Sequence, residues 1–302
     1  MKSLLENNDC PISQIKEPVL RALMFPKHAS PEVFEAAALL ASSSGAINAE
    51  SPCGDAAVNR VVSARRPDLL RILARHGADM NRREACGYTP LMSAAIAGDP
   101  KTVQALLDSG ADSSLAGLSG ETAILFSILG LSAECVALLL KSGACPDFPN
   151  SDGATPLGNS IAFGFLTGAR LLLSAGASPK LPAACNGSTE PPIFLAARKG
   201  RLDFCELLLQ FGASAHDRDS FGRTPLMAAA VFGHASCVRL LLPRSDAWAL
   251  DHSGQTVFDL RHPDVASIFS ERLHSETRLS EQQSHARSLA AKAALSPPRS
   301  IR

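Results

Sequence analysis

The chain has 302 residues and a formal net charge of zero, and 46% of its residues are hydrophobic whereas only 5% are aromatic. This apolar content is ample for a core, and the neutral balance excludes the basic stripe expected of a dedicated nucleic-acid binder. No run of about 18 apolar residues predicts a membrane span, and residues 1–9 lack the apolar segment of a secretory signal.

The N-terminal segment, residues 1–49, shows little pattern over its first 23 residues. Ser30-Pro31-Glu32 is a typical helix start, and residues 33–40 follow as an amphipathic helix that ends near Gly45-Ala46. We interpret 1–49 as a degenerate N-terminal repeat or cap, with a separate functional segment as the alternative.

One phrase recurs along the chain and is clearest at residues 222–242, which read GRTPLMAAAVFGHASCVRLLL. Thr224 can cap a helix, because its hydroxyl can accept an orphan backbone N–H, and Pro225 suits the first helical position. Gly233-His234 ends that short helix, and a second, Leu-rich helix follows. Shorter versions of the phrase begin upstream at Gly87, Gly120 and Gly153.

A Gly-Ala pair ends each predicted second helix and gives the spacing of the units. The pairs begin at Gly45, Gly77, Gly110, Gly143, Gly176 and Gly212, in steps of 32, 33, 33, 33 and 36 residues. Such a glycine can adopt the left-handed conformation that closes a helix. The longer last step coincides with residues 188–192, which predict an insertion in one loop. The nearly fixed period predicts one linear stack of units.

The pattern Thr-Pro-Leu-x-x-Ala-Ala-x-x-Gly-His, which residues 224–234 follow, resembles the ankyrin repeat. The resemblance covers about residues 50–273 and implies an all-α solenoid of stacked helix-turn-helix units joined by β-hairpin loops. It implies ankyrin repeats over 50–255 and a C-terminal capping half-repeat over 256–273. Residues 274–302 form a polar tail, which we expect to be partly helical or disordered.

The units depart from the family pattern after Thr-Pro-Leu, where a family histidine usually links neighbouring loops. The matching residues are Asn59, Met92, Leu125, Gly158, Phe194, Met227 and Asp259. We therefore expect apolar packing there in place of the usual loop-to-loop hydrogen bonding. The unit from Thr155 departs most, because Gly158 gives its first helix poor propensity. We expect this unit to be the weakest, and Gly158→Ala to raise stability where no side chain occupies that space.

The eight cysteines form no C-x-x-C pair and no zinc spacing, and Cys135, Cys205 and Cys237 fall within the predicted Leu-rich helices. We interpret these residues as reduced thiols that pack as small hydrophobes in an intracellular, cytoplasmic protein. The Asn186-Gly187-Ser188 glycosylation pattern would have no role there. The sequence has no metal-binding motif and no Gly-rich phosphate loop, so we expect no metal and no cofactor.

A catalytic role has little support in the sequence. Residues 158–162, GNSIA, partly match the G-x-S-x-G nucleophile elbow, but a Thr-Pro helix start precedes them and alanine replaces the last glycine. The histidines are scattered, and His234 matches the structural Gly-His of the family. We expect no enzymatic activity; the alternative is a cryptic catalytic segment in residues 1–50 or 274–302, which lack a nucleophile–base set.

The resemblance places partner contacts at the hairpin tips and at the exposed ends of the first helices. The matching residues are Tyr88, Ile96, Leu129, Phe163, Phe221 and Phe232. Because this set is unusually apolar for a solvent-facing surface, we predict a binding stripe on the concave face; packing between units is the alternative. Arg198, Lys199 and Arg223 are predicted to form a basic rim around it, with a solvated surface as the alternative.

These features predict a monomeric protein-interaction module that serves another protein as an adaptor, inhibitor or scaffold. Recognition would be non-covalent, with no nucleic acid and no membrane span involved. The alternative is an effector that a bacterium delivers into a host cell through a dedicated secretion system.

Overall fold

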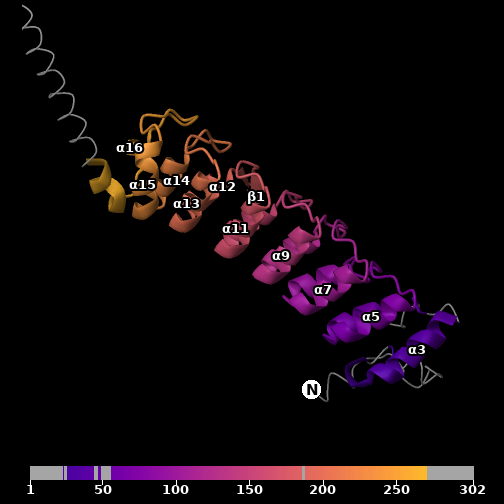
Figure 1. Cartoon of the computed structure of the whole chain (residues 1–302). Helices are drawn as coiled ribbons and strands as arrows, with labels where there is room; N and C mark the ends of the chain where they lie inside the picture. The colour runs from indigo at the N-terminus through magenta and orange to yellow at the C-terminus, as the bar shows by residue number, and fades with distance from the viewer. Residues whose placement is uncertain (1–22, 24–25, 44–46, 49–55, 186–187, 271–302) are drawn as a thin grey trace, which may run out of the picture.

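The computed structural model describes residues 23, 26–43, 47–48, 56–185 and 188–270. Figure 1 shows pairs of short helices stacked in a row, with the connecting loops gathered along one edge. We call the first helix of each pair inner and the second outer. Inner helices contact inner helices of the next pair, and outer helices contact outer ones. This all-α solenoid confirms the predicted fold class.

The α-helices between α3 and α16 are seven to nine residues long, whereas α3 has 13 residues and α16 has four. The inner helices are α4 (Ala57–Ser63), α6 (Pro90–Ile96), α8 (Ala123–Leu129), α10 (Pro156–Phe163), α12 (Pro192–Arg198), α14 (Pro225–Val231) and α16 (Val257–Leu260). The outer helices are α3 (Pro31–Ser43), α5 (Pro67–Arg75), α7 (Pro100–Asp108), α9 (Ala133–Lys141), α11 (Leu166–Ser174), α13 (Leu202–Gln210) and α15 (Ala235–Leu241). Short 3-10 turns are η2 (Pro26–His28), η3 (Leu242–Arg244) and η4 (Pro263–Val265), and β1 (Ala183–Cys185) and β2 (Ser188–Glu190) form a hairpin.

Local sequence signals set the starts of several inner helices. The hydroxyl oxygen of Thr224 accepts a hydrogen bond from the backbone N–H of Met227, at 3.3 Å, as the sequence predicted. Thr89 caps α6 in the same way through Met92. In both helices the methionine sulfur accepts in return from the backbone N–H of the threonine, at 3.4 Å. Each threonine–methionine pair thus satisfies two backbone donors that a helix start leaves open.

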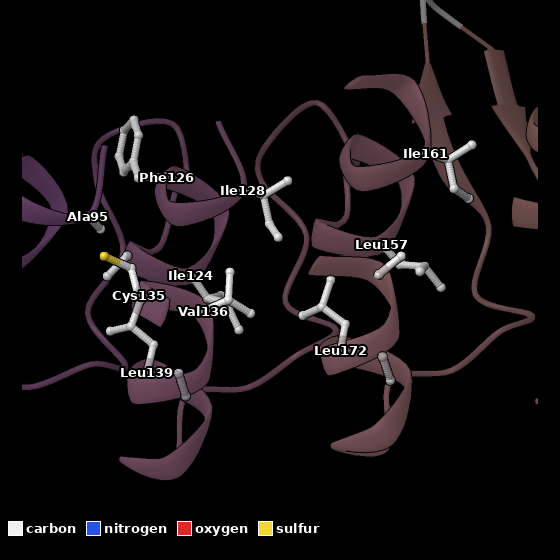
Figure 2. Close-up of a cluster of buried hydrophobic side chains, with 14 of the residues drawn as sticks. Ala95, Ile124, Phe126, Ile128, Cys135, Val136, Leu139, Leu157, Ile161 and Leu172 are labelled. Carbon is white, nitrogen blue, oxygen red and sulfur yellow. The ribbon is translucent and has the colours of Figure 1, made fainter. Parts of the chain in front are cut away.

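The core is continuous from one unit to the next. Inner and outer helices of the complete pairs are only seven to nine residues long, and isolated helices shorter than about 12 residues are marginal in water. Figure 2 shows Ile128 and Val136 directed toward the next unit, from which Leu172 points back. All three side chains are fully buried. Packing between units therefore supplies the stability that each short helix lacks.

The glycines that end the outer helices behave as their spacing predicted. Gly77, Gly110, Gly143, Gly176 and Gly212 all have φ between 82° and 95°. A side chain would be strained in this left-handed region, so glycine closes each helix at low cost. The prediction of buried cysteines is also confirmed, because Cys135, Cys205 and Cys237 are free and buried. Burial raises the pKa of the Cys135 thiol.

The expected loss of loop-to-loop hydrogen bonds is wrong. Apolar packing at the histidine-equivalent positions is confirmed, for instance at Met92 and Phe194, which are buried. Several neighbouring loops are nevertheless linked by a different residue at the base of the loop. The side-chain oxygen of Asn81 accepts from the backbone N–H of Asp112 in the next unit, at 2.8 Å.

The same link recurs along the stack. Asn48 accepts from the N–H of Asp79 at 2.8 Å, and Asp147 accepts from the N–H of Ser178 at 3.0 Å. Direct backbone bonds join other loops, for example from the N–H of Ser151 to the carbonyl oxygen of Ser119, at 2.8 Å. Side-chain and backbone acceptors therefore link these loops although no described unit has a histidine after Thr-Pro-Leu.

The predicted insertion forms the β1–β2 hairpin, and this hairpin explains Gly158. Ala183 and Ala184 of β1 pair with Glu190 and Thr189 of β2. A Cβ added at Gly158 of α10 would lie 2.4 Å from the Cβ of Ala183, which is fully buried. The condition attached to the expected gain from Gly158→Ala, that no side chain occupies this space, is therefore not met, because Ala183 of the hairpin lies there.

Other sequence-based expectations concern residues outside this description. The polar tail 274–302, Asn186 and Gly187 lie outside the described residues, as does Gly45. Within the described ranges, no helix is both long enough and apolar enough to cross a membrane.

Gly158→Ala is expected to destabilise the protein by about 1–3 kcal/mol, because the added methyl group overpacks the contact with Ala183. The double variant Gly158→Ala with Ala183→Gly moves the methyl group to the other partner and should recover most of the loss. Urea unfolding of the full chain, followed by circular dichroism, measures both effects. A stability gain for Gly158→Ala alone would contradict the close approach of these residues.

Asn81→Ala is expected to cost about 0.5–1.5 kcal/mol, because the N–H of Asp112 loses its acceptor in the neighbouring loop. Ser114 occupies the matching place one unit later, but its hydroxyl donates within its own loop, to Asp112. Ser114→Ala is therefore the matched control and should cost less. Thermal unfolding compares the two variants, and equal losses would argue against a contribution from the link between loops.

Candidate functional site

Four apolar side chains lie at the C-terminal ends of the inner helices. Ile96, Leu129 and Phe163 are the last residues of α6, α8 and α10, and Phe232 directly follows α14. Their exposed fractions are 47%, 39%, 55% and 51%. The earlier turns of each inner helix are buried between neighbouring inner helices, so the last residue is the first to reach solvent. We call these four residues the apolar stripe.

Tyr88 was predicted in the same stripe, but the structure places it differently. The residue is half-buried, and its ring packs edge-to-face against Phe126 of α8, with ring centroids 4.8 Å apart. Phe126 itself is buried. Tyr88 therefore fills space between two units, which is the alternative that the sequence left open for this set.

Phe221 lies at a hairpin tip and is exposed. The guanidinium of Arg223 lies 5.0 Å from its ring centroid and 5.6 Å from that of Phe194. Asp219 holds this guanidinium through two hydrogen bonds, from Nε at 2.9 Å and from Nη2 at 2.7 Å. Two aromatic rings and one carboxylate thus fix the orientation of Arg223.

The predicted basic rim consists of two ion pairs and a lysine. Arg198 of α12 pairs with Glu190 of β2 at 3.1 Å, and Arg223 pairs with Asp219 at 2.7 Å. The carboxylate side chains are only 7% and 2% exposed, whereas the arginine side chains are 22% and 31% exposed. Lys199, at the end of α12, is exposed. The rim is therefore more than a solvated basic surface, because its arginines are held by buried acids.

His234 has the structural role that the family pattern implied. Its Nε2 lies 3.0 Å from the carbonyl oxygen of Arg198, at the end of the preceding inner helix. A carbonyl oxygen only accepts, so Nε2 carries the proton and donates. The His234 ring also stacks nearly parallel on Phe232, with an interplanar angle of 15°. One imidazole therefore links two units and supports an exposed aromatic ring.

Sequence reasoning missed several exposed apolar side chains on the loops. Leu118 lies over Gly87 of the preceding loop, and Trp248 packs on Phe258 with ring centroids 4.6 Å apart. Both Leu118 and Trp248 are exposed. The repeat spacing places both residues in loops between units, which is the signal that could have identified them. The sequence also gave no signal for the partners Glu190 and Asp219.

Comparison with known proteins agrees with this geometry. A sequence profile described as ankyrin repeats (3 copies) matches residues 28–117 and 181–255, which together exceed half of the 302 residues. The chain belongs to the ankyrin-repeat family. The unmatched stretch between these ranges contains α8 to α11, which form the same helix pairs as the matched units. Its departures in sequence therefore leave the repeat architecture intact.

Curated relatives share only short segments with this ankyrin-repeat chain. Protein phosphatase 1 regulatory subunit 12A of Mus musculus is 34% identical over 93 residues, covering 28% of this chain and 9% of that protein. Arf-GAP with coiled-coil, ANK repeat and PH domain-containing protein 2 of Gallus gallus is 49% identical over 53 residues. This match covers 18% of this chain and 7% of that protein. The chain thus spans less than a tenth of the length of these relatives.

Solved structures resemble the ankyrin-repeat solenoid over most of its length. The ankyrin repeat domain of Bcl-3 matches with a TM-score of 0.64 and 24% identity, covering 72% of this chain and 99% of that one. The ankyrin repeat domain of human ASB11 matches with a TM-score of 0.59 and 24% identity, covering 70% and 94%. These similarities establish the fold. They do not identify a ligand, which depends on the surface residues of this chain.

Phe163→Ala and Phe232→Ala are each expected to change the free energy of unfolding by about 1 kcal/mol or less, because half of each ring is already in water. Phe194→Ala is the matched comparison, because this phenylalanine is fully buried in the same region. It should cost about 3–5 kcal/mol. Urea unfolding distinguishes the two classes, and comparable losses would assign the stripe residues to the core.

Proposed function

We propose that this protein is a non-catalytic adaptor, inhibitor or scaffold that binds another protein on the face formed by its inner-helix ends. The observation that carries the proposal is the apolar stripe, since Ile96, Leu129, Phe163 and Phe232 are exposed at nearly the same place in separate units. Units that stack bring such residues into line. Exposed apolar side chains that recur at one place along a stack are typical of an interaction site.

The relatives support a regulatory binding role. By their names, one is a regulatory subunit of a phosphatase and the other is an Arf-GAP that carries ANK repeats. In both, the region similar to this chain is a small part of a larger protein. This is consistent with the repeat segment serving as a binding element, with activities carried elsewhere.

The chemistry of the described residues also supports a non-catalytic role. The Ser160 hydroxyl, the nucleophile candidate of the GNSIA segment, is fully buried and donates to the carbonyl oxygen of Pro156 at 2.8 Å. A buried hydroxyl engaged in its own helix cannot reach a substrate. In the part of the chain that the structure describes, no group of three or more His, Cys, Asp or Glu side chains could hold a metal ion.

The test is a crosslinked pull-down from the source cell with the full chain. We expect the double variant Phe163→Ala, Phe232→Ala to lose a protein that the unchanged chain captures, because aromatic anchors at a hot spot each contribute about 2 kcal/mol or more. Phe211→Ala is the matched control, since Phe211 is exposed at the end of outer helix α13. Capture that persists in the double variant, or that Phe211→Ala abolishes equally, would contradict the proposal.

A further inference from the structure

Three consecutive inner helices present a mixed pattern at one position. Phe163 ends α10, Lys199 follows the last residue of α12, and Phe232 follows the last residue of α14. The three residues are at equivalent places in successive units, counted from the start of each inner helix. All three are exposed, and α12 contacts both α10 and α14. Across three neighbouring helices, an exposed cationic side chain therefore lies between two exposed apolar ones.

The charge around this position is cationic at the surface and anionic beneath it. Glu190 and Asp219, the acidic partners of Arg198 and Arg223, are almost fully buried. The arginine side chains are more exposed than these carboxylates, although Nη2 of Arg198 is itself buried. Lys199, the residue after Arg198, is exposed and adds a third positive charge at the end of α12.

This arrangement is confined to the C-terminal half of the stripe. The equivalent residues on α6 and α8 are Ile96-Ala97 and Leu129-Gly130, which carry no charge. A partner that follows the inner-helix ends therefore meets an uncharged apolar surface first and a single cationic position later. This difference can fix the direction and register in which a partner docks.

The contacts of His234 hold the surface in place. The imidazole stacks on Phe232 and donates to the carbonyl oxygen of Arg198, the residue before Lys199. Gly200, with φ of +68°, leaves the space for this ring, because a Cβ there would lie 2.5 Å from Nδ1 of His234. An aromatic ring that is already positioned loses less conformational entropy on binding.

We infer that Phe163, Lys199 and Phe232 bind a peptide segment of the partner that carries one acidic side chain between two apolar ones. The inference rests on the proposed function and adds the chemistry of the partner. The phenylalanine rings would cover the apolar side chains, and Lys199 would pair with the carboxylate where those rings limit the access of water. A nucleic acid fits less well, since buried carboxylates offset both arginines and the net charge of the chain is zero.

The test is selection of random linear peptides displayed on phage against the immobilised full chain. The selected peptides should share an apolar–acidic–apolar pattern. With Lys199→Glu as bait, the central acidic residue should be replaced by lysine or arginine. A synthetic peptide from the first selection should bind Lys199→Glu about tenfold more weakly or worse, as expected when a partly desolvated charge pair becomes repulsive.

Lys141→Glu is the matched control, because Lys141 is exposed at the end of outer helix α9. It should leave both the selected pattern and the affinity unchanged. The inference is overturned if no peptides are selected, if both baits select one pattern, or if the central residue is not acidic. Displacement of the peptide by a single-stranded oligonucleotide would likewise overturn it in favour of a nucleic-acid ligand.

The Phe163→Ala, Phe232→Ala variant separates this inference from the proposed function. If the cellular partner is lost in that variant but unaffected by Lys199→Glu, the protein-binding function stands and the acidic-peptide chemistry fails. If neither change affects capture of the partner, the inner-helix ends are not the binding face and both fail.

Discussion

The stacking of short helices on their neighbours is the interaction on which the rest of this structure depends. An inner helix such as α8 has seven residues, of which only the last, Leu129, is exposed. Its other side chains need the adjacent inner helices on both sides, because a helix of this length is not stable alone. On the inner helices, the positions that are free to vary are therefore the helix ends. A specific surface on this side of the protein has to be built from those ends and from the loop tips.

The candidate surface is built from the same contacts that hold the stack together. His234 joins the end of α12 to the start of α15 and also supports the ring of Phe232. Asp219 closes its own hairpin, through the N–H of Phe221, and also orients the guanidinium of Arg223. Because these links have both roles, the surface is organised before a partner arrives. The packing of the solenoid therefore holds the side chains of this surface in place, which lowers the entropy lost on binding.

The unit around α10 illustrates how tertiary contacts offset a weak local sequence. Gly158 lowers the intrinsic helix propensity of this segment, yet α10 forms with the threonine cap at Thr155 intact, at 3.1 Å. The absent side chain lets the inserted hairpin approach until Ala183 lies against the helix. The insertion and the glycine are thus two parts of one packing arrangement. Each appears as a defect when the repeat pattern is considered alone.

Much of the architecture could be derived from the sequence, and the reason is that its determinants are local. Helix starts at Thr224, the closing glycine at Gly110 and the exposure of Phe163 at a helix end depend on residues within a few positions along the chain. The tertiary structure decided what the sequence did not determine. The pairing of Asn81 with the next loop, the inward packing of Tyr88 and the occupied space beside Gly158 depend on residues about 25 to 40 positions away. These contacts require the actual distances between stacked units, whereas a repeat period gives only their order.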